Sequence, residues 1–144
     1  MQVDFYQLSR DPVEAVVPLL AAKALDASQR LLVVHEDAEQ RAVLSEALWA
    51  RENAFLAHGD AAAPQAERQP ILLAGDCTAA NGAGIVFLAD GAWREEAAGF
   101  ERAILLFGAE QTAQVRTLWT TLSGSGHALR IFKQREDGSW REGR

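Results

Sequence analysis

Short runs of apolar residues alternate along this chain with segments whose apolar residues recur every three or four positions. The first pattern is typical of strands buried on both faces of a parallel sheet, and the second is typical of amphipathic helices. We expect strands at residues 2–8, 30–37, 71–75, 84–91, 102–108 and 127–134. In the last of these, apolar and charged positions alternate, which indicates an exposed edge of the sheet.

The first expected helix begins at Asp11, after the first strand. Asp11 can accept a hydrogen bond at the N-cap, Pro12 suits the first turn, and Glu14 completes the spacing of a capping box. Pro18 lacks the N–H that would bond to the carbonyl of Glu14, so we expect a kink or an irregular first turn there.

Two further helices are expected. Asp37 should cap a helix whose last turn is closed by Trp49. The third helix has apolar residues at positions i, i+3, i+4 and i+7 and is ended by glycines. Those apolar residues are Val115, Leu118, Trp119 and Leu122.

The alternation of strands and helices predicts an α/β fold of the Rossmann-like kind, with a mainly parallel central sheet, helices on both of its faces and an antiparallel C-terminal edge strand. A length of 144 residues, 49% of them hydrophobic, fits a single domain spanning residues 1–144. Residues 59–70 are rich in Ala, Pro and polar side chains and are expected to form a surface loop. Residues 135–144 are expected to form a turn or a flexible tail.

Composition and charge narrow the function classes. No apolar run approaches the roughly 20 residues of a membrane helix, and the N-terminus lacks a secretory signal, so a cytoplasmic location is expected. Residues 130–144 hold five Lys or Arg and three Asp or Glu, which gives this segment a net charge of +2. Because the whole chain carries −6, residues 1–129 carry a net charge of −8. A protein region with this much negative charge binds DNA or RNA poorly, so we expect any nucleic-acid role to be indirect.

Candidate chemistry is sparse. His35 follows the second strand and Asp76 and Cys77 follow the third, at the sheet edge where ligands of α/β proteins gather. A small α/β enzyme that uses His35 and Asp76 is therefore an alternative function. Cys77 is the only cysteine, the three histidines lack the spacing of a metal site, and no glycine-rich stretch has the form of a phosphate loop. We expect no cofactor and no metal.

Four segments in order, "DFYQL", "RLLVVHED", "ALWARENAFLAHG" and "VRTLWTTLSGSG", resemble the chi subunit of bacterial DNA polymerase III holoenzyme. The resemblance spans nearly the whole chain. It implies a small α/β protein without catalytic activity that binds the acidic C-terminal tail of single-stranded DNA-binding protein. It also implies a link to the clamp loader through the psi subunit or an equivalent, and a helicase partner in repair.

The resemblance places the tail-binding site on the last helix, at Arg116 and Trp119. Some chi-like sequences carry Lys one turn before this Arg, where this chain has Thr112. Tail affinity is then expected to be weaker, unless Arg130 and Lys133 on the next strand substitute. A guanidinium beside an apolar pocket suits an acidic peptide that ends in a large apolar residue and a free carboxylate.

The resemblance also implies that psi or the helicase docks at Trp49, Phe55 and Leu56. From its place at the end of an amphipathic helix, Trp49 is expected to lie at least half in the core. Phe55 follows a charged joint and is expected at the partner surface, with a core position as the alternative. His58 is expected to shape the turn.

Overall fold

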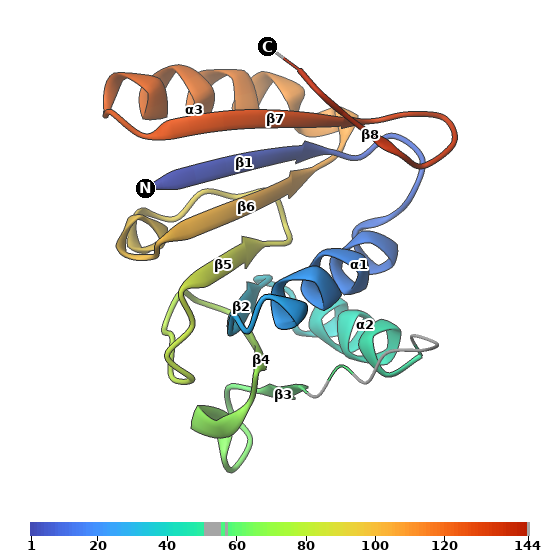
Figure 1. The fold of residues 1–144 in the computed structure, drawn as a ribbon, viewed down its shortest axis with the longest axis vertical. Helices are drawn as coiled ribbons and strands as arrows, with labels where there is room; N and C mark the ends of the chain where they lie inside the picture. Colours follow the sequence, from blue (N-terminus) through green and yellow to red (C-terminus); the bar gives the residue numbers. More distant parts are fainter. Residues whose placement is uncertain (51–55, 57, 144) are drawn as a thin grey trace.

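A computed structural model describes residues 1–50, 56 and 58–143 of the chain. Among these residues, eight strands form one sheet in the order β3-β4-β2-β5-β6-β1-β7-β8 (Figure 1). All neighbouring strands run parallel except β7 and β8. The strands are β1 (Gln2–Gln7), β2 (Leu31–Val34), β3 (His58–Asp60), β4 (Ile71–Ala74), β5 (Ile85–Leu88), β6 (Arg102–Phe107), β7 (Ala128–Gln134) and β8 (Trp140–Glu142).

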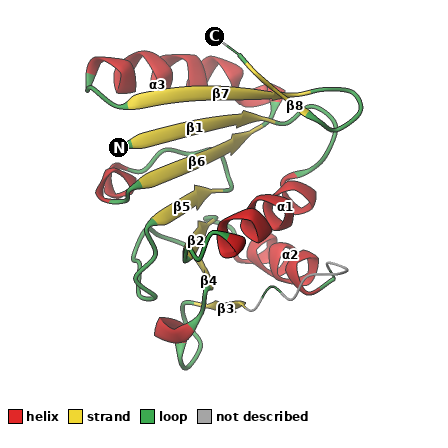
Figure 2. Cartoon of the chain, viewed as in Figure 1, coloured by secondary structure: helices red, strands yellow, loops and turns green. Residues whose placement is uncertain are grey.

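Helices cover both faces of this sheet, as Figure 2 shows. The helices α1 (Val13–Asp26) and α2 (Ala38–Trp49) lie together on one face, and α3 (Thr112–Gly124) lies on the other. Short 3-10 helices add η1 (Ala66–Arg68), η2 (Glu95–Gly99) and η3 (Ala109–Gln111). Among the described residues, no helix is both long and apolar enough to span a membrane.

The central strands bury side chains on both faces because helices or loops cover both. Val33 packs with α1 and α2, whereas its neighbour Val34 packs on the face of α3. All four residues of β2, of β4 and of β5 are buried. This explains why these strands appear in the sequence as continuous apolar runs, and it confirms the expected α/β class.

The start of α1 differs from the expected capping box. The helix begins at Val13, with Pro12 at the N-cap position and no side-chain cap. The carboxylate of Asp11 instead accepts a hydrogen bond of 2.8 Å from the side-chain amide of Gln134 at the end of β7. A partner distant in sequence has replaced the local one, and α1 continues as a helix through Pro18. The predicted cap of α2 is confirmed, since Asp37 accepts from the backbone N–H of Glu39 at 2.9 Å.

Both edges of the sheet differ from the sequence-based expectation. The expected loop at 59–70 contains the end of β3 and all of η1, and the expected tail at 135–144 contains β8. The expected antiparallel C-terminal edge strand is present, but it is β8, and β7 lies between β1 and β8. The indole of Trp140 holds β8 in place by an edge-on contact with Tyr6, with ring centroids 5.0 Å apart. Strands of three residues are too short to show an alternating pattern, so they could not be predicted from the sequence.

Candidate functional site

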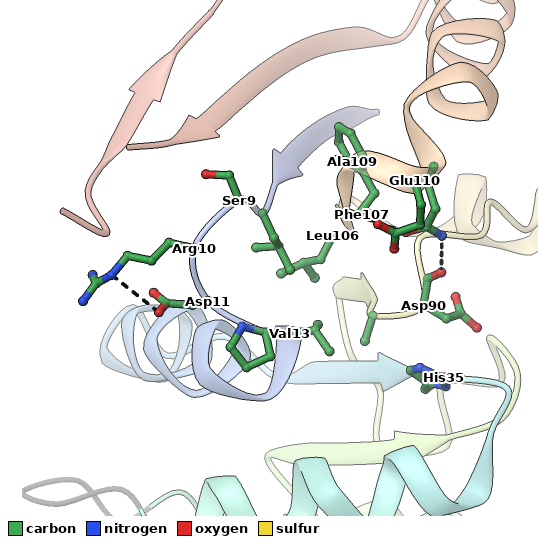
Figure 3. A pocket seen from close by; sticks show the side chains of 15 residues that line it. Ser9, Arg10, Asp11, Val13, His35, Asp90, Leu106, Phe107, Ala109 and Glu110 are labelled. Atoms are coloured by element: carbon green, nitrogen blue, oxygen red, sulfur yellow. Dashed lines mark hydrogen bonds and ion pairs between the residues drawn. The ribbon is translucent and has the colours of Figure 1, made fainter. Parts of the chain in front are cut away.

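One hollow lies at the carboxyl ends of the strands, between the segments that follow β1 and β6 (Figure 3). This strand-end crevice has a volume of about 740 Å³ and includes His35, but Asp76 does not line it. The Nδ1 atom of His35 accepts a hydrogen bond from the backbone N–H of Asp37, 3.1 Å away. Asp76 is exposed, and it accepts from the backbone N–H of Thr78. The two residues of the alternative enzyme site are therefore not gathered in one hollow.

Shifted pKa values in this region include that of Asp90, which lines the crevice, and that of Cys77, which does not. Burial would raise the pKa of Asp90, but hydrogen bonds from Arg94 and from backbone N–H groups outweigh burial and lower it. Asp90 is thus an anion already held by Arg94, at 2.7 Å. Burial raises the pKa of the nearby Cys77 thiol, which keeps it protonated and weakly nucleophilic. Within the described part of the chain, no three His, Cys, Asp or Glu side chains are grouped to hold a metal ion.

A second hollow, the α3 groove, lies between α3 and the sheet and has a volume of about 470 Å³. It forms because α3 packs on the sheet through Val115, Leu122 and the ring of Trp119, whose centroid lies 5.0 Å from that of Phe5. The first turns of the helix then overhang the ends of three strands. The groove is lined by Val115, Arg116 and Trp119 from α3 and by Gln7, Ile131 and Lys133 from the sheet.

Strand register explains the floor of this groove. Phe107 of β6 pairs with Gln7 of β1, and Gln7 pairs with Lys133 of β7. Paired residues of neighbouring strands point to the same face, and here that face is the one covered by α3. The three side chains therefore form a row under the helix that is apolar at one end and cationic at the other.

Arg116 is the charged group of the groove wall. It is exposed on α3 and makes no ion pair with any described carboxylate. Trp119 lies one turn further along the helix and is half-buried. The guanidinium, an indole and the aliphatic side chains of Val115 and Ile131 thus line the same hollow. This combination can bind a carboxylate and an apolar side chain together.

Thr112 also lines the groove, as the sequence predicts, but it contributes no charge. Its hydroxyl donates to the backbone carbonyl of Ala109 at 2.7 Å, which ties it to the start of the helix. One turn after Arg116, Thr120 lines the groove as well and its hydroxyl donates to the Arg116 carbonyl. The helix therefore brings a single cation to the groove.

Arg130, expected to substitute for the missing lysine, does not line the groove. Side chains alternate along β7, so Arg130 points to the face opposite Ile131 and Lys133. There its Nε atom lies 3.1 Å from Asp4 Oδ1. Asp4 is fully buried and also accepts from Arg102, so it needs both guanidinium groups. Of the two residues that were expected to substitute for the lysine, Lys133 lines the groove and Arg130 does not.

The two expected docking residues that the structure describes, Trp49 and Leu56, lie in different environments. The side chain of Trp49 is 56% exposed, so the expectation that it lies at least half in the core is wrong. It ends α2 and packs its ring against His58, with centroids 4.5 Å apart, instead of entering the core. Leu56 is buried at 3% exposure and cannot present its side chain to a partner. Phe55 lies outside the described residues.

His58 is fixed under Trp49 from two sides. Its Nε2 atom shares a hydrogen bond of 2.8 Å with the hydroxyl of Ser45, and its Nδ1 atom shares one of 2.8 Å with the carbonyl of Leu56. The bond to Ser45 joins α2 to the start of β3, and together the two bonds fix the ring on which the exposed indole packs. Both ring nitrogens of His58 thus have partners within the fold, and His58 begins a strand, whereas the sequence predicted a turn.

Comparison with known protein families identifies the family to which this chain belongs. The model for the family described as DNA polymerase III chi subunit, HolC, matches residues 1–130. The chain belongs to the chi family. The resemblance seen in the four sequence segments is thus confirmed, and the protein is an accessory subunit of DNA polymerase III that serves DNA replication. No curated protein matches the chain.

The matched region contains β1 through β6, all of α3 and the first three residues of β7. It therefore includes Arg116 and Trp119. Lys133 and the whole of β8 follow residue 130 and lie outside the match. The match thus includes the helix wall of the α3 groove, and the cationic end of its floor follows the matched residues.

Proposed function

We propose that this chi-family protein captures the acidic C-terminal tail of single-stranded DNA-binding protein in the α3 groove. It links that protein to the clamp loader, through psi or an equivalent, without catalysing a reaction. The observation that carries the proposal is the position of Arg116, which lies without a described carboxylate partner in the wall of a groove shared with Trp119.

Physical complementarity supports this ligand. A guanidinium can donate two parallel hydrogen bonds to a terminal carboxylate, and the apolar wall beside it can accept the last side chain of the peptide. The rest of the protein repels an acidic peptide, because residues 1–129 carry a net charge of −8. The cations at the groove are then the local feature that directs such a peptide to this place.

The terminal carboxylate is the group that tests this proposal. A tail peptide with a free carboxylate should bind the wild-type protein at least tenfold more tightly than the same peptide with an amidated C-terminus, since amidation removes a charge-assisted bond of about 1.5–3 kcal/mol. Calorimetric titration of both peptides measures the difference. Equal affinities would show that the carboxylate is not recognised and would contradict the proposal.

We further propose that the exposed face of α2 around Trp49 docks psi or, in repair, a helicase. A large indole with few rotatable bonds is the kind of side chain that concentrates binding energy at an interface. Trp49 and the α3 groove lie over opposite faces of the sheet, since α2 and α3 do. The protein can therefore hold both partners at once.

Trp49→Ala should weaken binding of psi by about 2 kcal/mol or more, the usual cost of removing an interface anchor. Surface plasmon resonance with purified psi measures this change. Val43→Ala is the matched control, because Val43 is also exposed on α2 but lies on another side of the helix. Tail-peptide binding should be the same in both variants. Unchanged psi binding by Trp49→Ala would remove the docking assignment.

A further inference from the structure

The cationic end of the α3 groove continues beyond the groove itself. Strand β7 pairs antiparallel with β8, and in this register Lys133 stands directly opposite Arg141. Both side chains point to the face covered by α3, because Lys133 alternates with residues that face the other way. The row that begins at Phe107 and Gln7 therefore extends to a second cation at the edge of the sheet.

Two cations opposite one another on an antiparallel pair repel and destabilise the pair unless an anion lies between them. Neither Lys133 nor Arg141 makes an ion pair or a side-chain hydrogen bond with the described residues. Together they line a hollow of about 630 Å³ with Glu142 and Gly143. Glu142 pairs with Phe132, so its side chain is directed to the opposite face, where its charge acts on Arg130.

Lys133 joins this hollow to the α3 groove, since it lines both. The two hollows therefore adjoin at Lys133, and the residues that line them extend from Trp119 and Arg116 to Arg141. Lys133 and Arg141 belong to the hairpin of β7 and β8, and both follow the part of the chain that the chi family model matches.

We propose that Lys133 and Arg141 form a second anion-binding subsite, which holds acidic side chains upstream of the terminal carboxylate of a peptide bound at Arg116. This inference rests on the proposed function, and it specifies the orientation of the peptide in the groove. The apolar C-terminal residue lies beside Trp119, and the preceding acidic residues cross β7 toward β8. The hairpin cations thereby provide the charge that Thr112 and Thr120 do not bring from the helix.

Two synthetic peptides test the subsite. Both have the same apolar C-terminal residue and free carboxylate, but one has several aspartates just upstream and the other has asparagines in their place. Arg141→Gln should weaken binding of the aspartate peptide about three- to fivefold, the upper range for a solvent-exposed charge contact. It should leave binding of the asparagine peptide unchanged. The double variant Lys133→Gln with Arg141→Gln should weaken binding of the aspartate peptide further.

Arg68→Gln is the matched control, because it removes the same charge from an exposed residue of η1, near the opposite edge of the sheet. An equal effect of Arg141→Gln on both peptides, or no effect on either, would overturn the subsite. If Arg116→Ala weakens neither peptide while Arg141→Gln weakens the aspartate peptide, the proposed groove fails, and Lys133 and Arg141 bind acidic side chains independently of it. Failure of both peptides to bind the wild type would overturn both.

Discussion

Replacing Asp4 with asparagine should lower the free energy of unfolding by about 2–4 kcal/mol, because removing one member of a buried charge cluster leaves its partners uncompensated. Asp4 is fully buried in β1 and accepts hydrogen bonds from Arg102, Arg130 and, at 2.7 Å, Gln2. Asparagine has the same size but turns a donor toward guanidinium groups that need an acceptor. The partial exposure of both arginines keeps the loss below that of a wholly buried pair.

The contribution of Asp4 should also depend on pH. Burial would raise the pKa of its carboxyl group, but hydrogen bonds from Arg130, Gln2 and Arg102 outweigh burial and hold the pKa below the ordinary value of 3.8. A carboxyl group whose pKa is lowered by folding contributes its full stability above the unfolded pKa and loses it as the pH falls through the folded pKa. The difference in stability between the wild type and Asp4→Asn should therefore be constant at neutral pH and narrow below about pH 4.

Urea denaturation at several pH values measures both effects. Asp26→Asn is the control, because Asp26 is exposed at the end of α1 and its substitution should change stability by less than about 0.5 kcal/mol. An Asp4→Asn protein as stable as the wild type at neutral pH would contradict the assignment. So would a difference that widens in acid.

Replacing Arg116 with alanine should reduce affinity for the tail peptide about ten- to a hundredfold, the equivalent of about 1.5–3 kcal/mol for a charge-assisted contact. The melting temperature should hardly change, because Arg116 is exposed and no described carboxylate pairs with it. Calorimetric titration and thermal unfolding of the same preparation give both quantities.

The control for this variant is Arg68→Ala, which should leave both affinity and melting temperature unchanged. Retained tail affinity in Arg116→Ala would move the binding site away from α3. A large fall in melting temperature would show instead that the guanidinium stabilises the fold. Either result would contradict the inference that Arg116 is exposed because it binds a ligand.

Much of the fold could be predicted from the sequence because the sheet is buried on both faces. Four central residues such as those of β2 or β5 must all be apolar, and that pattern is visible without a structure. The cap at Asp37 could be predicted because its partner lies two residues away. The prediction that Asp11 caps the first helix was wrong because the hydrogen-bond partner of Asp11, Gln134, is 123 residues away in the sequence.

The candidate site was predictable on the helix and not on the sheet. Arg116 and Trp119 lie one turn apart, a spacing that the sequence shows directly. The exclusion of Arg130 depends on the register of β7 and on a buried carboxylate in β1. The sequence does contain one indication of this pairing. Asp4 is the only charged residue of its strand, and a buried carboxylate requires a cation beside it. Arg141 could not be predicted because the strand that carries it has only three residues.

The most direct test of the α3 groove uses the four tryptophan indoles as reporters, because each lies in a different place. Titration of the ¹⁵N-labelled protein with the tail peptide should shift the indole N–H resonance of Trp119, assigned by a Trp119→Phe variant. The resonance of Trp49 should stay fixed, since α2 lies over the opposite face of the sheet. A shift at Trp49 with none at Trp119 would place the peptide on the other face and contradict the account.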